Sequence, residues 1–183
     1  AYGQSGQTVK ARKLFDEMPE RNTASYNAMI TAYIRNKCVI EEAVKLFDEI
    51  PERNAISYAA MITGYVWAGM FDKAEKLYSD MPVKLRDPVC SNALINGYLK
   101  MGRLEEAGQI FEGMMERDVV SWSSMVDGYC KEEKVGDARN LFDIMPERNV
   151  VTWTAMIDGY MRLESFKDGF ELLFRCGLDD GFL

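Results

Sequence analysis

The amino-acid sequence predicts an all-α protein, a right-handed α-solenoid superhelix of stacked helix-turn-helix repeats, on two observations. The string Leu-Phe-Asp-x-hydrophobic-Pro-Glu-Arg-Asn occurs three times, at residues 14–22, 46–54 and 141–149. A second string, Ser-Tyr-Asn-Ala-Met-Ile-Thr-Ala-Tyr at residues 25–33, returns as Thr-Trp-Thr-Ala-Met-Ile-Asp-Gly-Tyr at residues 152–160. Strings that recur at a fixed period of about 20 to 50 residues are typical of repeat architectures.

Cutting the chain after the terminal Asn or Asp of each copy gives one solenoid over residues 1–180, followed by a tail of residues 181–183. The units are a partial repeat 1–22 and the complete repeats 23–54, 55–87, 88–118, 119–149 and 150–180. The partial repeat matches the last 22 residues of a complete one, which predicts that the chain starts in mid-repeat and is a fragment.

Each complete repeat predicts two helices in order. In the first half, positions 4, 7, 8 and 11 are apolar, as in Trp153, Met156, Ile157 and Tyr160. In the second half the same spacing is filled by Ala138, Leu141, Phe142 and Met145. Such spacing gives each helix one apolar face. A small residue recurs in the second half and predicts a close helix crossing, at Ala11, Ala43, Ala74, Ala107 and Ala138. A proline follows the second helix, where it cannot continue it, at Pro19, Pro51, Pro82 and Pro146. A single helical pair cannot bury both stripes, so neighbouring pairs stack.

Composition argues against catalysis and against a metal or other cofactor. The 183 residues include no His, the commonest general base and a common zinc ligand. The four cysteines are scattered, with no C-x-x-C pair. No apolar run approaches the roughly 20 residues that span a bilayer, which predicts no membrane partner. The net charge of −7 is unusual for a nucleic-acid-binding domain as an average, but a solenoid can carry different charges on different faces.

The units closely resemble pentatricopeptide repeats, specifically the short 31-residue type of the plant PLS class. The resemblance rests on Val-Val-Thr-Trp-Thr-Ala-Met-Ile-Asp-Gly-Tyr at residues 150–160 and on Ala-x-x-Leu-Phe-Asp-x-Met-Pro-Glu-Arg-Asn at residues 138–149. It extends over residues 1–180. It implies sequence-selective binding of single-stranded RNA, about one base per repeat, in RNA processing or editing in a mitochondrion or chloroplast. Other RNA-processing proteins are implied as further partners. The zinc-deaminase signature that RNA editing requires is absent from the chain.

In this family the fifth residue of a repeat and its last residue face the base edge. The resemblance therefore implies five base-reading pairs: Asn27 with Asn54, Ala59 with Asp87, Asn92 with Asp118, Ser123 with Asn149, and Thr154 with Asp180. By the family's pairing rules the pairs would read 5′-Y-N-U-A-G-3′. Two departures weaken this map: Ala59 has no hydrogen-bonding group, and the last repeat has Gly169 in place of the small Ala and lacks the Met-Pro-Glu-Arg ending.

Helical geometry supports the map independently of the family. At about 100° per residue, positions 2, 5 and 13 share one stripe, separate from the apolar core stripe. Position 2 offers apolar groups that could sandwich a base: Ala24, Ile56, Val89, Val120 and Val151. Position 5 is polar in four of five repeats and varies, whereas the core positions hardly change. Position 13 holds Trp67 once and otherwise cations that could contact phosphates: Arg35, Lys100, Lys131 and Arg162.

Other interpretations of these residues stay open. The terminal Asn or Asp is also a good N-cap for the next helix, a role for which Ser25, Ser57, Ser121 and Thr152 compete. Cations at position 13 lie near a helix C-terminus, which favours them in any case. The aromatic residues at position 4 fit the core better than a stacking platform. The alternative function is a helical-repeat scaffold for protein–protein interaction, alone or together with RNA, and the ends of a cut solenoid could pair two copies as a homodimer.

Overall fold

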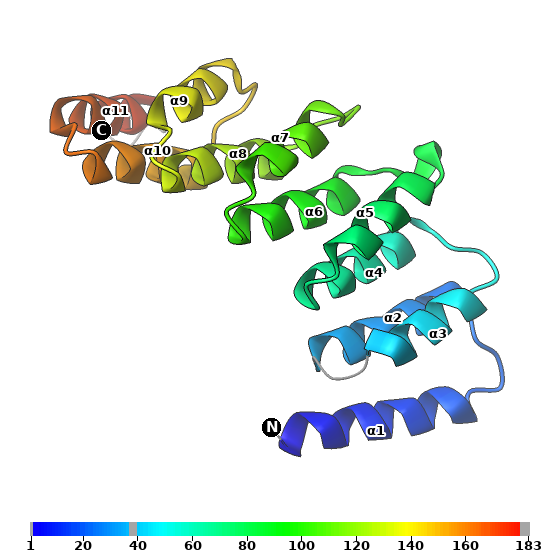
Figure 1. The fold of residues 1–183 in the computed structure, drawn as a ribbon. Helices are drawn as coiled ribbons and strands as arrows, with labels where there is room; N and C mark the ends of the chain where they lie inside the picture. Colours follow the sequence, from blue (N-terminus) through cyan, green and yellow to red (C-terminus); the bar gives the residue numbers. More distant parts are fainter. Residues whose placement is uncertain (1, 37–39, 180–183) are drawn as a thin grey trace. The chain divides into compact units, whose positions relative to one another are not determined.

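The computed structural model describes residues 2–36 and 40–179. Within these residues the protein consists of eleven α-helices and one short 3₁₀ helix, with no strand (Figure 1). The predicted all-α repeat fold is confirmed.

The helix bounds follow the predicted repeats closely. The helix of the partial repeat is α1 (Tyr2–Glu17). The first helices of the complete repeats each contain 13 residues: α2 (Thr23–Arg35), α4 (Ala55–Trp67), α6 (Pro88–Lys100), α8 (Val119–Lys131) and α10 (Val150–Arg162). The second helices are α3 (Ile40–Glu49), α5 (Phe71–Asp80), α7 (Leu104–Glu112), α9 (Val135–Ile144) and α11 (Phe166–Asp179). The 3₁₀ helix Val83–Leu85 lies between α5 and α6. Every first helix therefore starts at position 1 of its repeat and ends at position 13.

The chain divides into two compact units, residues 1–97 and 98–183, and the boundary falls inside α6. In the first unit α2 packs against α1, α3 and α4, and α4 packs against α5. In the second unit α8 packs against α7, α9 and α10, and α10 packs against α11. Within each unit, a first helix thus contacts both its own second helix and the first helix of the adjacent repeat.

The predicted apolar stripes form the core of each unit. In α2, Met29, Ile30 and Tyr33 are buried, and in α10 Trp153 and Met156 are buried. The recurring alanine has no exposed surface where it is described within a complete repeat, at Ala43, Ala74, Ala107 and Ala138. A methyl group with no exposed surface requires the neighbouring helix to pack directly against it. Their complete burial agrees with the predicted close crossing.

A second small position, at residue 10 of the first helix, brings adjacent first helices close together. A Cβ on Gly128 would lie 2.5 Å from Leu99 Cδ2, and one on Gly159 would lie 2.7 Å from Cys130 Sγ. In both cases the neighbour is position 12 of the preceding repeat. A Cβ at either position would require the Leu99 or Cys130 side chain to shift, so glycine lets the two first helices pack closely here.

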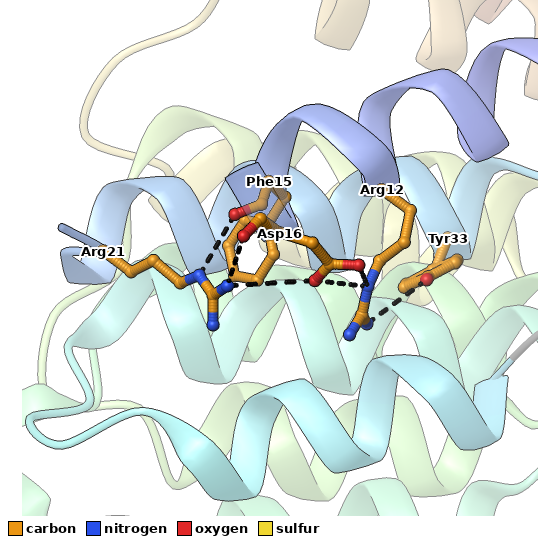
Figure 2. Close-up of polar contacts among 5 residues, drawn as sticks. All are labelled: Arg12, Phe15, Asp16, Arg21 and Tyr33. Carbon is orange, nitrogen blue, oxygen red and sulfur yellow. Dashed lines mark hydrogen bonds and ion pairs between the residues drawn. The ribbon is translucent and has the colours of Figure 1, made fainter. Parts of the chain in front are cut away.

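The Pro-Glu-Arg-Asn string forms the joint between repeats. Arg21 donates from Nε to the carbonyl oxygen of Phe15 (3.1 Å) and from Nη2 to that of Asp16 (3.0 Å), as Figure 2 shows. Its guanidinium lies 4.8 Å from the centre of the Phe15 ring, and that ring meets Tyr26 edge-to-face at 5.2 Å. The arginine thus satisfies carbonyls that the end of α1 leaves without helical partners. The same joint recurs as Arg53–Phe47–Tyr58, Arg117–Phe111–Trp122 and Arg148–Phe142–Trp153.

One joint uses different residues for the same contact. In the repeat 88–118, position 4 is Ser91 instead of an aromatic residue, and the facing ring is Tyr78 instead of Phe. The two hydroxyls share a hydrogen bond of 2.8 Å, and Arg86 lies over the Tyr78 ring at 5.3 Å. A hydrogen bond therefore replaces the aromatic pair. The position-4 aromatics are core residues, as predicted.

In the four repeats from residue 55 onward, the turn between the two helices places the position-15 residue in the left-handed region. This residue is Gly69 (φ 72°), Gly102 (φ 69°), Glu133 (φ 59°) or Glu164 (φ 57°). Glycine adopts this conformation freely, whereas a residue with a Cβ pays about 1–2 kcal/mol. The last two repeats are therefore strained at a turn that the repeats 55–87 and 88–118 build with glycine.

Candidate nucleic-acid interface

Within the described residues, the terminal Asn or Asp of each repeat that precedes another repeat caps the following helix. The Asn54 side chain accepts a hydrogen bond from the backbone N–H of Ser57 at 3.0 Å, and the Asp118 side chain accepts one from Ser121 at 2.8 Å. Asn22, Asp87 and Asn149 make the equivalent bond to Ser25, Cys90 and Thr152. The capping interpretation is confirmed, and the N-cap is the Asn or Asp rather than the following Ser or Thr. The cap uses one side-chain oxygen, and an Asn also has an amide NH₂, an Asp a second carboxylate oxygen.

In the first complete repeat the two predicted base-reading residues touch. The Asn27 amide donates from Nδ2 to Asn54 Oδ1 at 3.2 Å. Asn27 is only 6% exposed, and its own Oδ1 is buried and accepts no hydrogen bond from the described residues. An unsatisfied buried acceptor costs about 1–3 kcal/mol. A ligand donor that reached this oxygen would recover that energy.

In the repeat 119–149 the pair is connected through a third residue. The Ser123 hydroxyl lies 3.1 Å from the Thr152 hydroxyl, which donates to Asn149 Oδ1 at 2.7 Å. The Ser123 hydroxyl also lies 2.6 Å from the Val119 carbonyl oxygen, which is the alternative acceptor for its single hydrogen. The fifth and the last residue of this repeat are thus again linked at the N-terminus of the next first helix. The link here runs through two hydroxyl groups, whereas the first complete repeat uses two side-chain amides.

For the other three predicted base-reading pairs, the structure gives the positions of individual residues. Ala59 and Asn92 are buried at position 5, and Asp87 caps α6. Thr154 is exposed, and its predicted partner Asp180 lies outside the described residues. Asn92 and Asp118 belong to different units, so their pairing stays a prediction.

Position 2 of each complete repeat is an exposed apolar side chain in the first turn of the first helix. Ile56 is 65% exposed and Val151 61% exposed, and Val89, Val120 and Ala24 are also exposed. Apolar groups are thus left in water at the same place in each complete repeat, and their contact with a base stays a prediction.

Position 13 places the predicted cations at the exposed C-terminal ends of the first helices. They are Arg35, Lys100, Lys131 and Arg162. The five first helices carry only two acidic residues, Asp127 and Asp158, so most of the chain's negative charge lies elsewhere. Lys131 forms an ion pair with Asp127, Nζ to Oδ2 2.6 Å. The acidic residue four positions before the cation was not part of the predicted site, although the i, i+4 spacing was visible in the sequence.

A groove of about 260 Å³ lies between α2 and α4. Its lining residues are Thr31, Ile34 and Arg35 from α2, and Ile56, Ala59, Ala60, Thr63 and Trp67 from α4. Positions 2, 5 and 13 of α4 therefore open onto one surface, as their angular spacing predicts. Trp67, which departs from the series of cations, was not among the predicted site residues.

Two buried thiols offer no nucleophile at neutral pH. Burial raises the pKa of the Cys130 thiol to about 12 and also raises the pKa of Cys90. In the described ranges no group of three or more His, Cys, Asp or Glu side chains could hold a metal ion. None of the helices placed in residues 2–36 and 40–179 combines the length and apolarity needed to cross a membrane.

Comparison with known proteins gives consistent matches along the chain. Models of the PPR repeat match residues 1–23, 24–54, 56–84, 89–119, 114–146 and 151–176. A pentatricopeptide repeat-containing protein of Arabidopsis thaliana is 39% identical over 117 residues, covering 64% of this chain and 22% of its own length. A chloroplastic relative from the same plant is 34% identical over 131 residues, covering 66% of this chain and 16% of its own. Across such relatives the chain spans between 15% and 25% of their length.

A solved structure shows the same fold. The crystal structure of the pentatricopeptide repeat protein PPR10 in complex with an 18-nt psaJ RNA element superimposes with a TM-score of 0.72 at 23% identity. The match covers 93% of this chain and 26% of PPR10. PPR10 from maize, in a second crystal structure, gives a TM-score of 0.67 at 20% identity over 97% of this chain and 32% of PPR10.

Proposed function

The chain belongs to the pentatricopeptide repeat family, and on that premise we propose that it binds single-stranded RNA selectively, at about one base per repeat. The observation that carries the proposal is the contact between Asn27 and Asn54. Two residues 27 positions apart meet at a helix start, with a buried carbonyl oxygen that lacks a donor. A base edge that enters this junction would find both a donor and an acceptor.

The other positions on the same stripe have matching roles in the proposal. The exposed position-2 residues pack against base faces, and the position-13 cations contact the phosphates. The strand recognised would follow 5′-Y-N-U-A-G-3′ along the five complete repeats. The proposal assigns no chemical step to the chain itself.

We further propose that the chain acts in RNA processing or editing in an organelle. Several relatives are named chloroplastic or mitochondrial, which supports this setting. A chain that holds one strand extended would expose or shield a neighbouring RNA site for other RNA-processing proteins.

Fluorescence anisotropy of a labelled RNA that contains CAUAG, measured at two salt concentrations, tests the proposal. Tight binding that weakens with salt is expected, because phosphate contacts release counterions. A scrambled RNA and a matching duplex should bind weakly. Equal binding of the scrambled strand would reject one base per repeat, and no binding at low salt would reject RNA recognition.

The exchange Ser123→Asn sharpens this test at a single base. It converts the fourth pair to the Asn–Asn combination that the repeat 23–54 already contains, so the scaffold should accept it. The preference at the fourth base should move from A to a pyrimidine, with the other positions unchanged. A general loss of affinity at every position would indicate a packing defect, and circular dichroism would reveal it.

A protein partner is the second candidate function, favoured by the outer side of α11. Phe166, Phe170, Leu173 and Phe174 are all more than half exposed, at a spacing that places them on one side of the helix. Light scattering and cross-linking of the chain without RNA would test pairing of two copies through this side.

A further inference from the structure

The repeat 55–87 differs from the other complete repeats at two positions of the same stripe. At position 5, Ala59 cannot donate or accept a hydrogen bond, whereas the other four residues at this position can. At position 13, Trp67 stands where the other four repeats have Lys or Arg. Both changes remove the polar group that the proposed reading of a nucleotide would use. Both also make the same surface apolar.

The two residues that differ, Ala59 and Trp67, line the same groove. Ala59 and Trp67 line the cleft between α2 and α4, together with Ile56 and the position-13 cation of the preceding repeat, Arg35. The short Ala59 and Ala60 side chains leave the floor open, and Thr63 follows one turn further along α4. Ile56 is 65% exposed and Trp67 54% exposed. A large aromatic side chain held in water beside an apolar floor offers an unoccupied contact face.

The chemistry of the groove matches a nucleotide better than an apolar peptide. An indole face stacks on any of the four bases, and such stacking tolerates sequence because every base has a π-face. Arg35 supplies the positive charge that a phosphate requires at the same cleft. It also lines a second, more polar cleft with Gln7, Thr8 and Asn36 on the side of α1. One cation therefore faces two adjoining clefts, as a cation between successive nucleotides would.

We propose that this groove is a base-stacking subsite, in which Trp67 stacks on a nucleobase of the bound strand whatever its identity and Arg35 contacts the adjoining phosphate. The subsite rests on the RNA binding proposed above and deepens it. The repeat 55–87 contributes affinity without edge reading, and the second base of the recognised strand is unspecified because it is held by its face.

An abasic scan tests the subsite. Binding of the CAUAG strand to the unaltered chain and to Trp67→Ala is compared with strands that carry one abasic residue at each position in turn. On the intact strand, loss of the indole should weaken binding by about ten-fold, within the range found for base–aromatic stacking. On the strand that is abasic at the second position, the substitution should have no effect. Replacing the second base by each of the other three bases should change the affinity of the unaltered chain by less than two-fold.

Two further variants control the experiment. Met115→Ala removes an exposed apolar side chain from the turn after α7 and should leave RNA binding unchanged. Trp67→Lys gives the repeat the cation that its neighbours carry, and should steepen the salt dependence of binding without restoring the coupling to the second base. Circular dichroism of both Trp67 variants should match the unaltered chain, because the side chain is half exposed.

The outcomes separate the subsite from the function on which it rests. If RNA binds but Trp67→Ala weakens it equally on intact and abasic strands, the indole contacts ribose or phosphate and the stacking subsite is wrong. If Trp67→Ala has no effect on any strand, the groove does not contact the strand. If neither protein binds RNA at all, the proposed function itself fails, and a protein side chain becomes the better occupant for the groove.

Discussion

The same residue types connect α1 with α2 in the first unit and α9 with α10 in the second. Arg12 donates to Asp16 at 2.9 and 3.0 Å and to the Tyr33 hydroxyl at 3.5 Å (Figure 2). In the second unit Arg139 donates to Asp143 at 2.8 Å. In both units the carboxylate, and after it the tyrosine hydroxyl, raises the pKa of the arginine.

The stripe formed by the first helices differs between the same two units. Position 9 is Thr31, Thr63 and Asn96 in the first unit but Asp127 and Asp158 in the second. Lys131 is therefore paired at 2.6 Å, whereas the equivalent place in the first unit is a neutral hydroxyl beside Arg35. The first unit also contains the aromatic groove around Trp67.

The comparison distinguishes two kinds of position: those that pack adjacent repeats together, which are alike in both units, and those on the exposed stripe of the first helices, which differ. A residue at the joint must contact an aromatic ring, a backbone carbonyl or a neighbouring helix within a closely packed site, so few side chains are accepted there. A residue on the exposed stripe has no such packing constraint, and it can change charge or size with little effect on the fold.

The largest expected effect comes from breaking the joint that both units share. Phe142→Ala removes a buried ring that contacts Trp153 at 4.8 Å and Arg148 at 4.8 Å, and should lower the free energy of unfolding by about 3–5 kcal/mol. Phe47→Ala should cost a similar amount in the first unit. Urea denaturation measures both losses. Ile144→Ala, on the exposed side of α9, is the control and should change stability by less than about 0.5 kcal/mol. A loss of the same size for this control would contradict the joint model.

An intermediate effect is expected at the turn after the first helix, where the repeats differ. Glu133→Gly should raise the free energy of unfolding by about 0.5–1 kcal/mol, because φ is 59° at this residue and glycine relieves the strain. The reverse exchange, Gly69→Ala, should destabilise by about 1 kcal/mol, since its added Cβ meets no atom within 4 Å and only the φ of 72° opposes it. Glu132→Gly, next to the strained residue but with φ −87°, should give no gain. Thermal melts of the three variants suffice, and a gain at residue 132 would argue against backbone strain.

The smallest expected effect concerns charge on the first helices. Asp127→Asn releases Lys131 from its ion pair and should tighten RNA binding by up to about five-fold at low salt, because exposed pairs are worth about 0.2–1 kcal/mol. Thr31→Asp should weaken binding similarly by introducing the acid into the first unit. Asp137→Asn makes the same charge change on a second helix, and its affinity should match that of the unaltered chain. Anisotropy titrations at two salt concentrations measure these shifts, and equal tightening by both Asp→Asn exchanges would mean that only net charge matters.

Much of the fold could be predicted because the same residue pattern recurs in each repeat. The terminal Asn or Asp located the described N-caps of the first helices, and the recurring alanine located fully buried positions in the second helices. The role of Arg148 and its counterparts could not be predicted, because their partners are backbone carbonyls, which no sequence pattern displays. The glycine at position 10 was missed for a similar reason: its neighbour belongs to the previous repeat.

The candidate site was predicted less completely than the fold. Helical spacing placed positions 2, 5 and 13 of α4 on one groove. It did not predict that Asn27 and Ser123 would be buried at a junction instead of open on a face. That burial arises because the next first helix begins directly against position 5.

By itself, the sequence determined the repeat period, the two helices of each repeat and the residues that cap them, because these depend on local spacing and side-chain chemistry. Only the tertiary structure decided which atoms meet between repeats: the amide of Asn27 with Asn54, the hydroxyl of Ser123 with Thr152, and Trp67 with the groove that also contains Arg35. Those contacts depend on how closely and at what angle neighbouring helices pack, which is set by the volumes of all the side chains between them and not by any one position.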